Sequence, residues 1–320
     1  MPKYTFLLPA YKSRFFQETL ESIKQQTFKD FKVIVSDDCS PEPIHNIFVN
    51  VCNDDPRFIY RCNEKNIGGE KLVSHWNMLV CMCDTDFLIM AGDDDIYAPT
   101  FLEEADRLLH LYPDIDLIRA RAKRIDENGK VICKELIYEE YTNSLEFLYQ
   151  TANNQYINCI GNFVFRREAL KNKGGFINFP FAWFSDDATS IIMSPRGVVN
   201  TFDILFYFRS SMINISNMVD NTQCARLKSL TAANFWIWYL QYWQSIKDAY
   251  PSTSYNDYMI NFVKWSTEEY IIKIFHPTSL KCNFLNFIKL TNKFESRKRK
   301  LNLICSYIIE KYLFFFKKLR

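Results

Sequence analysis

The 320-residue chain is poor in several features that define other protein classes. It has only 8 glycines, so its fold does not depend on many left-handed turns. Its 10 cysteines include no CxxC pair, and Cys81 and Cys83 stand too close together for a zinc knuckle. We therefore interpret the cysteines as reduced core thiols of a cytosolic protein.

Long apolar runs are also missing. No segment offers about 18 uninterrupted apolar residues, so the sequence predicts no membrane-spanning helix. An apolar run near the start is broken by Pro9 and has no small-residue cleavage site, which argues against a signal peptide. Without repeats or Gly/Ser linkers, the chain has room for one large domain or two ordinary ones.

Strand-like and helix-like segments alternate through the first hundred residues. Strands are expected at Tyr4–Leu8, Phe31–Val35, Phe58–Cys62 and Phe87–Met90, and helices at Phe16–Gln26, Ile44–Cys52 and 69–82. A helix to Leu111, a strand at Asp116–Ile125 and a hairpin to Val131–Ile137 follow Pro99, and a long helical pattern begins near residue 223. This order predicts an α/β fold with a doubly wound sheet.

Three consecutive carboxylates, Asp93–Asp95, follow the expected strand Phe87–Met90. Like charges this crowded repel, and their pKa values rise unless a cation shares the site. At the carboxyl end of a strand, hard oxygen ligands suit Mg²⁺ or Mn²⁺ bridging a phosphate. A solvated acidic turn that caps the helix after Pro99 is the alternative. An EF-hand register fails because its sixth position is Ala98.

Two further turns, Pro9–Tyr11 and Asp37–Asp38, also follow expected strands. Because the carboxyl ends of parallel strands share one edge, the three turns predict a single crevice. The Tyr11 ring could stack on a nucleobase, and the carboxylate of Asp37 or Asp38 could accept a hydrogen bond from the imino group of that base. A half-buried surface aromatic and a helix-capping turn ending at Ser40 are the alternatives.

These segments resemble the inverting glycosyltransferases of family 2, which have the nucleotide-sugar-binding, Rossmann-like GT-A fold. The matching residues are Leu7–Tyr11, Thr19–Thr27, Phe31–Ser40, Asn66–Gly68, Asn77 and Asp94–Pro99. The resemblance implies a mixed α/β sheet in a catalytic domain over residues 1–222. Its nucleotide-sugar half covers about 1–99 and its acceptor half about 100–222, and a helical region follows over 223–320.

The resemblance also implies roles for single residues. Pro9, Ala10, Tyr11, Asp37 and Asp38 correspond to the nucleoside pocket, and Asn66 and Gly68 to a loop beside the nucleotide. The metal motif, which holds Mn²⁺ or Mg²⁺ on the diphosphate, matches Asp94 together with Asp93 or Asp95. Since the family's usual first aspartate is Gly92 here, which pair binds metal stays open. We assign Asp94 and Asp95 to the metal and Asp93 to the donor.

An acidic pair in the second half of the chain resembles the family's catalytic base. Inversion by direct displacement needs a carboxylate that deprotonates the acceptor hydroxyl. Asp187, after the loop Gly174–Phe176, aligns with that base, and Asp186 with the usual glutamate before it. The alternative is an N-capping pair for a helix at Ala188–Met193.

The end of the chain is strongly basic. Residues 281–320 carry 11 Lys or Arg against 2 Glu, interleaved with aromatics, although the whole chain has a net charge of only +2. A basic amphipathic helix on an anionic membrane surface fits this composition. Nucleic-acid binding and a helix packed on the domain are the alternatives. Because family members commonly use lipid-linked acceptors, we favour the membrane and no nucleic acid.

We therefore expect a metal-dependent, inverting glycosyltransferase in the cytoplasm, peripheral on the inner face of the cell membrane. It would move a sugar from a UDP-linked donor to a saccharide or lipid-linked acceptor, in bacterial capsule, O-antigen or lipopolysaccharide synthesis. A sugar-nucleotide nucleotidyltransferase would need a Gly-rich basic loop where Pro9–Ser13 has no glycine. A nucleotide-binding scaffold without catalysis would not need Asp187.

Overall fold

The computed structural model of the chain describes residues 2–153, 155–214, 222–259 and 261–262. The chain divides into two compact units, Met1–Met218 and Val219–Arg320. The domain boundary that the sequence predicts at residue 222 stays a prediction. The basic tail of residues 281–320 lies outside the described residues.

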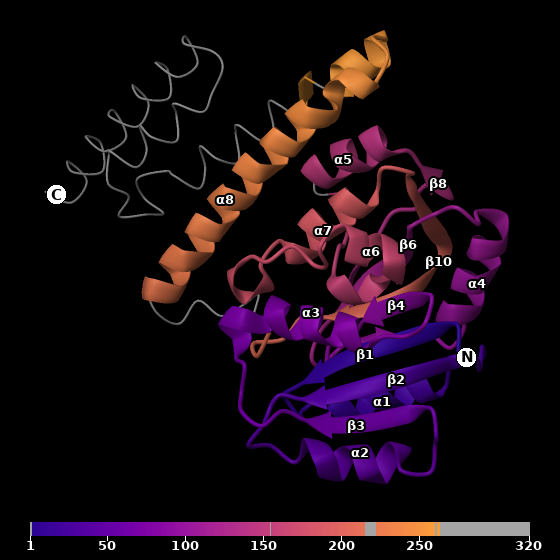
Figure 1. Cartoon of the computed structure of the whole chain (residues 1–320), viewed down its shortest axis with the longest axis vertical. Coiled ribbons are helices and arrows are strands. Elements are labelled where there is room, and N and C mark those ends of the chain that lie inside the picture. The colour runs from indigo at the N-terminus through magenta and orange to yellow at the C-terminus, as the bar shows by residue number, and fades with distance from the viewer. Residues whose placement is uncertain (1, 154, 215–221, 260, 263–320) are drawn as a thin grey trace, which may run out of the picture. The chain divides into compact units, whose positions relative to one another are not determined.

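The described part of the first unit is built on one mixed sheet (Figure 1). Its strands are β1 (Tyr4–Ala10), β2 (Phe31–Asp37), β3 (Phe58–Cys62), β4 (Phe87–Met90), β5 (Ile96–Tyr97), β6 (Leu117–Ile125), β7 (Val131–Lys134), β8 (Tyr141–Thr142), β9 (Phe163–Arg166) and β10 (Val198–Arg209). Their order is β3-β2-β1-β4-β9-β6-β10-β5, while β7 pairs with β6 and β8 with β10.

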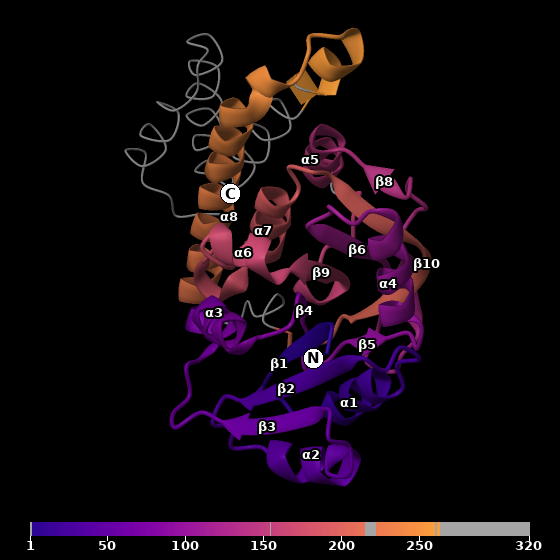
Figure 2. The ribbon, with the colours of Figure 1, turned by 45° about the vertical axis from the view of Figure 1, so that its right-hand side comes forward.

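Two halves of this sheet differ in strand direction. The strands β3, β2, β1 and β4 lie side by side in Figures 1 and 2 and are parallel to one another. In contrast, β9 runs antiparallel to both β4 and β6. The α/β fold with a mixed sheet, predicted from the sequence, is therefore confirmed.

Seven α-helices and three 3-10 turns connect these strands within the described residues. The helices are α1 (Phe16–Lys24), α2 (Ile44–Cys52), α3 (Leu72–Met82), α4 (Phe101–Leu111), α5 (Ser144–Ala152), α6 (Arg167–Asn172) and α7 (Ser185–Met193). The 3-10 turns are Gly69–Lys71, Ile160–Asn162 and Pro180–Ala182. In α4, for example, Phe101, Leu102, Ala105, Leu108 and Leu109 are buried, which is the spacing of one helix face.

An aromatic cluster in the core fixes the short strand β5 beside the turn Asp93–Asp95. The ring centroid of Tyr97 lies 5.1 Å from that of Phe6, 4.9 Å from Phe101 and 5.3 Å from Phe206. Its hydroxyl donates to the Gly161 carbonyl at 3.0 Å. Each such ring pair contributes about 0.5–1.5 kcal/mol beyond its buried area, so the acidic turn rests on a rigid support.

The described part of the second unit is mainly helical, as the sequence predicts. It contains α8 (Thr222–Ile246), a 3-10 turn at Lys247–Ala249 and further helix over residues 254–259. None of the helices within the described ranges combines the length and apolar character needed to cross a bilayer.

The interpretation of the cysteines as core thiols is wrong for four of them. Cys39, Cys62, Cys81 and Cys133 are exposed free thiols. Cys133, for instance, lies on β7, all four residues of which are exposed because this strand pairs only with β6. Membership of an apolar run therefore does not by itself bury a cysteine.

Candidate functional site

The three turns that were expected to share one edge of the sheet do so. Ala10 pairs with Asp37 at the ends of β1 and β2, and Leu7 pairs with Met90 at the end of β4. The Asp38 amide then donates to the Ala10 carbonyl at 2.9 Å. The chain segments after β1, β2 and β4 consequently leave the sheet beside one another.

Asp38 organises the loop that contains Asn66 and Gly68. Its carboxylate accepts hydrogen bonds from the Ile67 and Gly68 amides at 2.9 and 3.0 Å and from Asn63 Nδ2 at 2.9 Å. Asn66 Nδ2 donates to the Asp38 carbonyl at 2.8 Å. Gly68 has a φ of +82°, which favours glycine. The structure thus joins these predicted site residues, with Asp38 as the brace of the loop.

Asp37 and Tyr11 border the same edge of the sheet. One oxygen of Asp37 accepts from the Ser40 amide at 2.8 Å and the other from the Tyr60 hydroxyl at 2.6 Å. Tyr11, directly after Pro9 and Ala10, is 43% exposed, and its carbonyl accepts from Ser40 Oγ. The hydrogen bond between Asp37 and the Ser40 amide closes a turn, as in the alternative that interprets these residues as a helix-capping turn. The Tyr11 ring remains accessible for stacking.

The acidic turn contains a resident cation that the sequence analysis missed. Lys12 Nζ lies 3.0 Å from Asp94 Oδ2 and 3.4 Å from Asp93 Oδ1. Asp93 Oδ2 also accepts from the Tyr11 and Lys12 amides at 3.0 and 2.9 Å. Burial opposes a charged Lys12, but the two carboxylates outweigh it and raise the pKa of this amine. The sequence could have indicated this role of Lys12, because the residue directly follows Tyr11 at the end of a strand.

Asp95 is held from the opposite side by the end of β10. Its Oδ1 accepts from the Arg209 amide at 3.0 Å, and Arg209 Nε donates to the Asp94 carbonyl at 2.9 Å. Burial raises the pKa values of both Asp94 and Asp95, the second further because Asp94 lies next to it. These carboxylates do not cap α4, whose N-cap is Thr100, so the alternative of a capping turn is wrong.

The carboxylates of Asp94 and Asp95 fit a divalent cation bound together with phosphates. A Cβ at Gly92 would stand 3.2 Å from Asp94 Oδ1 and 2.9 Å from Asp95 Oδ2, so both oxygens face the space that glycine leaves open. No three His, Cys, Asp or Glu side chains form a complete cage anywhere in the described ranges. Mg²⁺ sites built from one or two carboxylates and substrate phosphates need no such cage.

A clamped and strained loop leads into the helix α7. Asn77 on α3 donates to the Phe176 carbonyl at 3.0 Å and accepts from the Phe176 amide at 2.8 Å. Phe181, Ala182 and Phe184 then adopt φ values of 57°, 57° and 64° without being glycines. Strain of this kind costs about 1–3 kcal/mol per residue and persists only where the surroundings enforce it.

Asp186 and Asp187 lie in the first turn of α7, which begins at Ser185. Both are partly exposed, yet their carboxylates are poorly solvated. Burial and the neighbouring Asp187 raise the pKa of Asp186 to about 8. Burial also raises the pKa of Asp187, to about 6, against the lowering effects of Asn158 and Arg119. Asp186 Oδ1 accepts from the Asp187 amide at 3.0 Å.

Cys159 connects the two acidic clusters. Its Sγ lies 3.6 Å from Asp95 Oδ2, and burial followed by the charges of Asp95 and Asp186 raises the pKa of this thiol. Cys159 therefore contacts the turn Asp93–Asp95 and lies close enough to Asp186 to feel its charge. Neither Cys159 nor Asn158 has a sequence signal, because both lie in an irregular segment before β9.

Comparison with known proteins agrees with this architecture. The profile of Glycosyl transferase family 2 matches residues 5–174. An uncharacterized glycosyltransferase of Methanocaldococcus jannaschii is 32% identical over 129 residues, 40% of this chain and 43% of that protein. A GalNAc(5)-diNAcBac-PP-undecaprenol beta-1,3-glucosyltransferase of Campylobacter jejuni is 29% identical over 96 residues, 30% of each chain. The chain thus matches less than half the length of these curated relatives.

Solved structures share the fold at low sequence identity. S. aureus TarS 1-349 in complex with UDP-GlcNAc matches with a TM-score of 0.66 and 17% identity, over 91% of this chain and 79% of that one. The mannosyltransferase PcManGT of Pyrobaculum calidifontis, in complex with GDP-Man and Mn²⁺, matches with a TM-score of 0.53 and 13% identity, over 95% and 79%. The predicted GT-A fold is confirmed.

Proposed function

The chain belongs to glycosyl transferase family 2, and from this premise we propose that it transfers a sugar from a nucleotide-sugar donor to a saccharide acceptor. One observation carries the proposal. Cys159 Sγ lies 3.6 Å from Asp95 Oδ2, and the charge of Asp186 at the start of α7 is near enough to raise the pKa of this thiol, which supports one shared site for the two clusters. A nucleotide-binding scaffold would not need the second cluster. A nucleotidyltransferase would need a Gly-rich loop at Pro9–Ser13, where this chain has no glycine.

In the proposed reaction, Asp187 accepts the proton of the acceptor hydroxyl. The acceptor oxygen forms its bond to the anomeric carbon as the bond from that carbon to the diphosphate breaks on the opposite face, which inverts the centre. Asp94 and Asp95 would hold Mn²⁺ or Mg²⁺, which supplies positive charge toward the departing diphosphate. Tyr11 and Asp37 would bind the nucleobase side of the donor.

The relatives support a UDP-linked donor and a polysaccharide setting. TarS is described in complex with UDP-GlcNAc and with UDP. The glucosyltransferase of Campylobacter jejuni carries an undecaprenol-linked saccharide in its name, and ExoW of Rhizobium meliloti is a succinoglycan biosynthesis protein, 29% identical over 114 residues. We therefore propose a saccharide or lipid-linked acceptor in bacterial surface polysaccharide synthesis.

A thermal-shift screen tests the donor. Full-length protein is heated with UDP-glucose, UDP-galactose, their N-acetyl derivatives, GDP-mannose or the nucleotides alone, each with Mn²⁺ or with EDTA. A ligand that binds only the folded state raises the melting temperature, and we expect UDP-sugars with Mn²⁺ to do so. Stabilisation by UTP together with a sugar 1-phosphate, and pyrophosphate release, would instead identify a nucleotidyltransferase.

We further propose that the basic tail of residues 281–320 attaches the protein to the inner face of the cell membrane. Each Lys or Arg near an anionic surface contributes about 1 kcal/mol, and salt screens this attraction. The excess of 11 basic over 2 acidic residues therefore suffices even if half of it reaches the lipid. Co-sedimentation with phosphatidylserine vesicles at low salt tests this, and full-length protein that stays in the supernatant would contradict it.

A further inference from the structure

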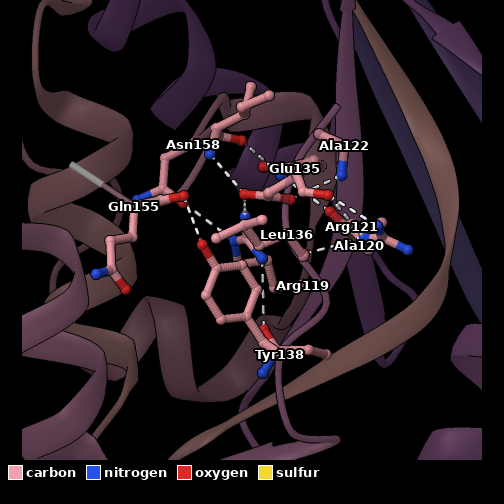
Figure 3. A network of polar contacts seen from close by, with 12 residues as sticks. Arg119, Ala120, Arg121, Ala122, Glu135, Leu136, Tyr138, Gln155 and Asn158 are labelled. Carbon is pink, nitrogen blue, oxygen red and sulfur yellow. Dashed lines mark hydrogen bonds and ion pairs between the residues drawn. The ribbon is translucent and has the colours of Figure 1, made fainter. Parts of the chain in front are cut away.

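A fully buried ion pair lies behind the carboxylate pair of α7. The Arg119 guanidinium on β6 and the Glu135 carboxylate after β7 both have side chains with 0% exposure and contact each other directly (Figure 3). Glu135 also accepts from the Ala122 amide at 2.8 Å and the Ile157 amide at 2.5 Å. Desolvating two such charges is costly, so the pair is not explained by stability alone.

Asn158 connects this ion pair to Asp187. Arg119 Nε donates to Asn158 Oδ1 at 3.1 Å, and Asn158 Nδ2 donates to Asp187 Oδ1 at 2.8 Å. Arg119 itself is fixed by Glu135 and by the Tyr156 ring, whose centroid lies 4.0 Å from the guanidinium carbon. Glu135, Arg119, Asn158 and Asp187 therefore form one chain of hydrogen bonds from the buried pair to the carboxylate.

This chain permits only one orientation of the Asn158 amide. If the amide were flipped, its NH₂ group would face the Arg119 N–H and its oxygen would face the Asp187 carboxylate. Both contacts would then be repulsive. The guanidinium thus fixes the amide, and the amide in turn occupies Asp187 Oδ1. For the second oxygen, Oδ2, no hydrogen-bond donor is found among the described residues, so it stays available for an acceptor.

We infer that Asn158 is a positioning residue that aims Asp187 Oδ2 at the acceptor hydroxyl and keeps Asp187, rather than Asp186, as the ionised carboxylate. The inference rests on the proposed function, in which Asp187 is the base. Asp187 is faced by Asp186 on its own helix and by Arg119 from β6, while Asp186 lies near Cys159. A donor on the charged form favours that form, and only Asp187 of the two has an amide donor from outside α7 among the described contacts.

The test compares two leucine substitutions. Asn158→Leu removes the donor from Asp187, while Asn200→Leu removes a different buried amide, whose Oδ1 lies 3.5 Å from Arg119 Nη1 and does not contact Asp187. UDP release from UDP-glucose or UDP-N-acetylglucosamine, with Mn²⁺ and water as acceptor, is measured from pH 5 to 9. Asn158→Leu should lower kcat about 10- to 100-fold, leave the donor KM unchanged and move the acid limb of the kcat profile to higher pH.

Urea unfolding provides a readout that needs no turnover. Asn158→Leu should cost more stability at pH 8.5, where Asp187 is ionised, than at pH 5, where the carboxyl holds its proton. Asn200→Leu should lower the free energy of unfolding by the same amount at pH 5 and pH 8.5. If Asn158→Leu does not fold, Asn158→Ser, whose hydroxyl is too short to reach both neighbours, gives the same comparison.

The outcomes separate the inference from the proposed function. If Asp187→Asn retains wild-type turnover, the base has been assigned wrongly and the proposed function fails at that residue. Suppose that Asp187→Asn is inactive, but Asn158→Leu has the wild-type rate and acid limb, and its stability cost is the same at pH 5 and pH 8.5. Only the positioning role is then overturned. A matching shift of the acid limb in Asn200→Leu would also overturn it, because the effect would then come from Arg119 alone.

Discussion

The turn Asp93–Asp95 and the pair Asp186–Asp187 both crowd carboxylates together, but different partners compensate their charges. The turn has the Lys12 ammonium within 3.4 Å of two carboxylates and the Arg209 backbone and guanidinium on its other side. Among the described residues outside α7, the pair is contacted by the uncharged amide of Asn158, with the Arg119 guanidinium one residue further away. The turn therefore has cationic partners in direct contact and the pair has a neutral one, although burial raises the carboxyl pKa values in both places.

This difference matches what each cluster would have to do. A cluster that binds a metal and a diphosphate must stay anionic and receive positive charge, which a resident lysine already supplies before the donor binds. A base must instead accept a proton near neutral pH, so a raised carboxyl pKa is an advantage. Burial raises the pKa values in both places, and in the turn the Lys12 ammonium acts against that rise from direct contact with Asp94.

The largest expected effect comes from removing the base. Asp187→Asn keeps the side-chain shape and an oxygen for Asn158, but it cannot take the acceptor proton. We expect turnover to fall about 10²- to 10⁴-fold while UDP affinity, measured by calorimetry, stays within the wild-type range. Wild-type turnover in this variant would move the role of base to another residue, with Asp186 as the next candidate.

A smaller effect is expected from the acidic turn. Asp94→Asn should weaken UDP-sugar binding in Mn²⁺ at least about 10-fold, since even substitutions around metal ligands have effects of that size. In EDTA the wild type and the variant should bind UDP equally. Equal wild-type affinity with Mn²⁺ and with EDTA would show that Lys12, and no metal, supplies the positive charge to the diphosphate.

The sequence predicts the nucleotide side of the site better than the side of the base. The three turns after β1, β2 and β4 could be placed together because parallel strands end at one edge. Arg119, Glu135 and Asn158 meet only through the β6–β7 hairpin and an irregular segment before β9, and no local pattern marks such contacts.

The length and packing of individual elements also depend on tertiary contacts. The helix that the sequence predicts at Ala188–Met193 begins at Ser185, because the preceding loop holds Phe184 in a left-handed conformation. Exposure of Cys133 follows from the edge position of β7, which the composition of Val131–Ile137 does not reveal. These features follow from neighbours distant in sequence.

The smallest expected effect concerns stability and pH. The pKa of Asp186 is raised in the folded protein to about 8, whereas an unfolded aspartate has a pKa of about 4. The folded state therefore binds more protons between these values, and the contribution of Asp186 to stability is fully present below pH 4 and is lost as pH rises through 8. Asp186→Asn, which keeps an oxygen for the Asp187 amide, should remove this loss.

The variant should consequently be more stable than the wild type by about 1–3 kcal/mol at pH 9 and unchanged near pH 4, in urea unfolding followed by tryptophan fluorescence. Asp84→Asn is the matched control of opposite sign. Hydrogen bonding to Lys32 lowers the pKa of Asp84, so this substitution should cost stability above pH 4, and the cost should vanish as pH falls. A stability curve of Asp186→Asn that runs parallel to that of the wild type from pH 4 to 9 would mean that Asp186 is ionised throughout. The contrast between the two carboxylate clusters would then be wrong for the pair on α7.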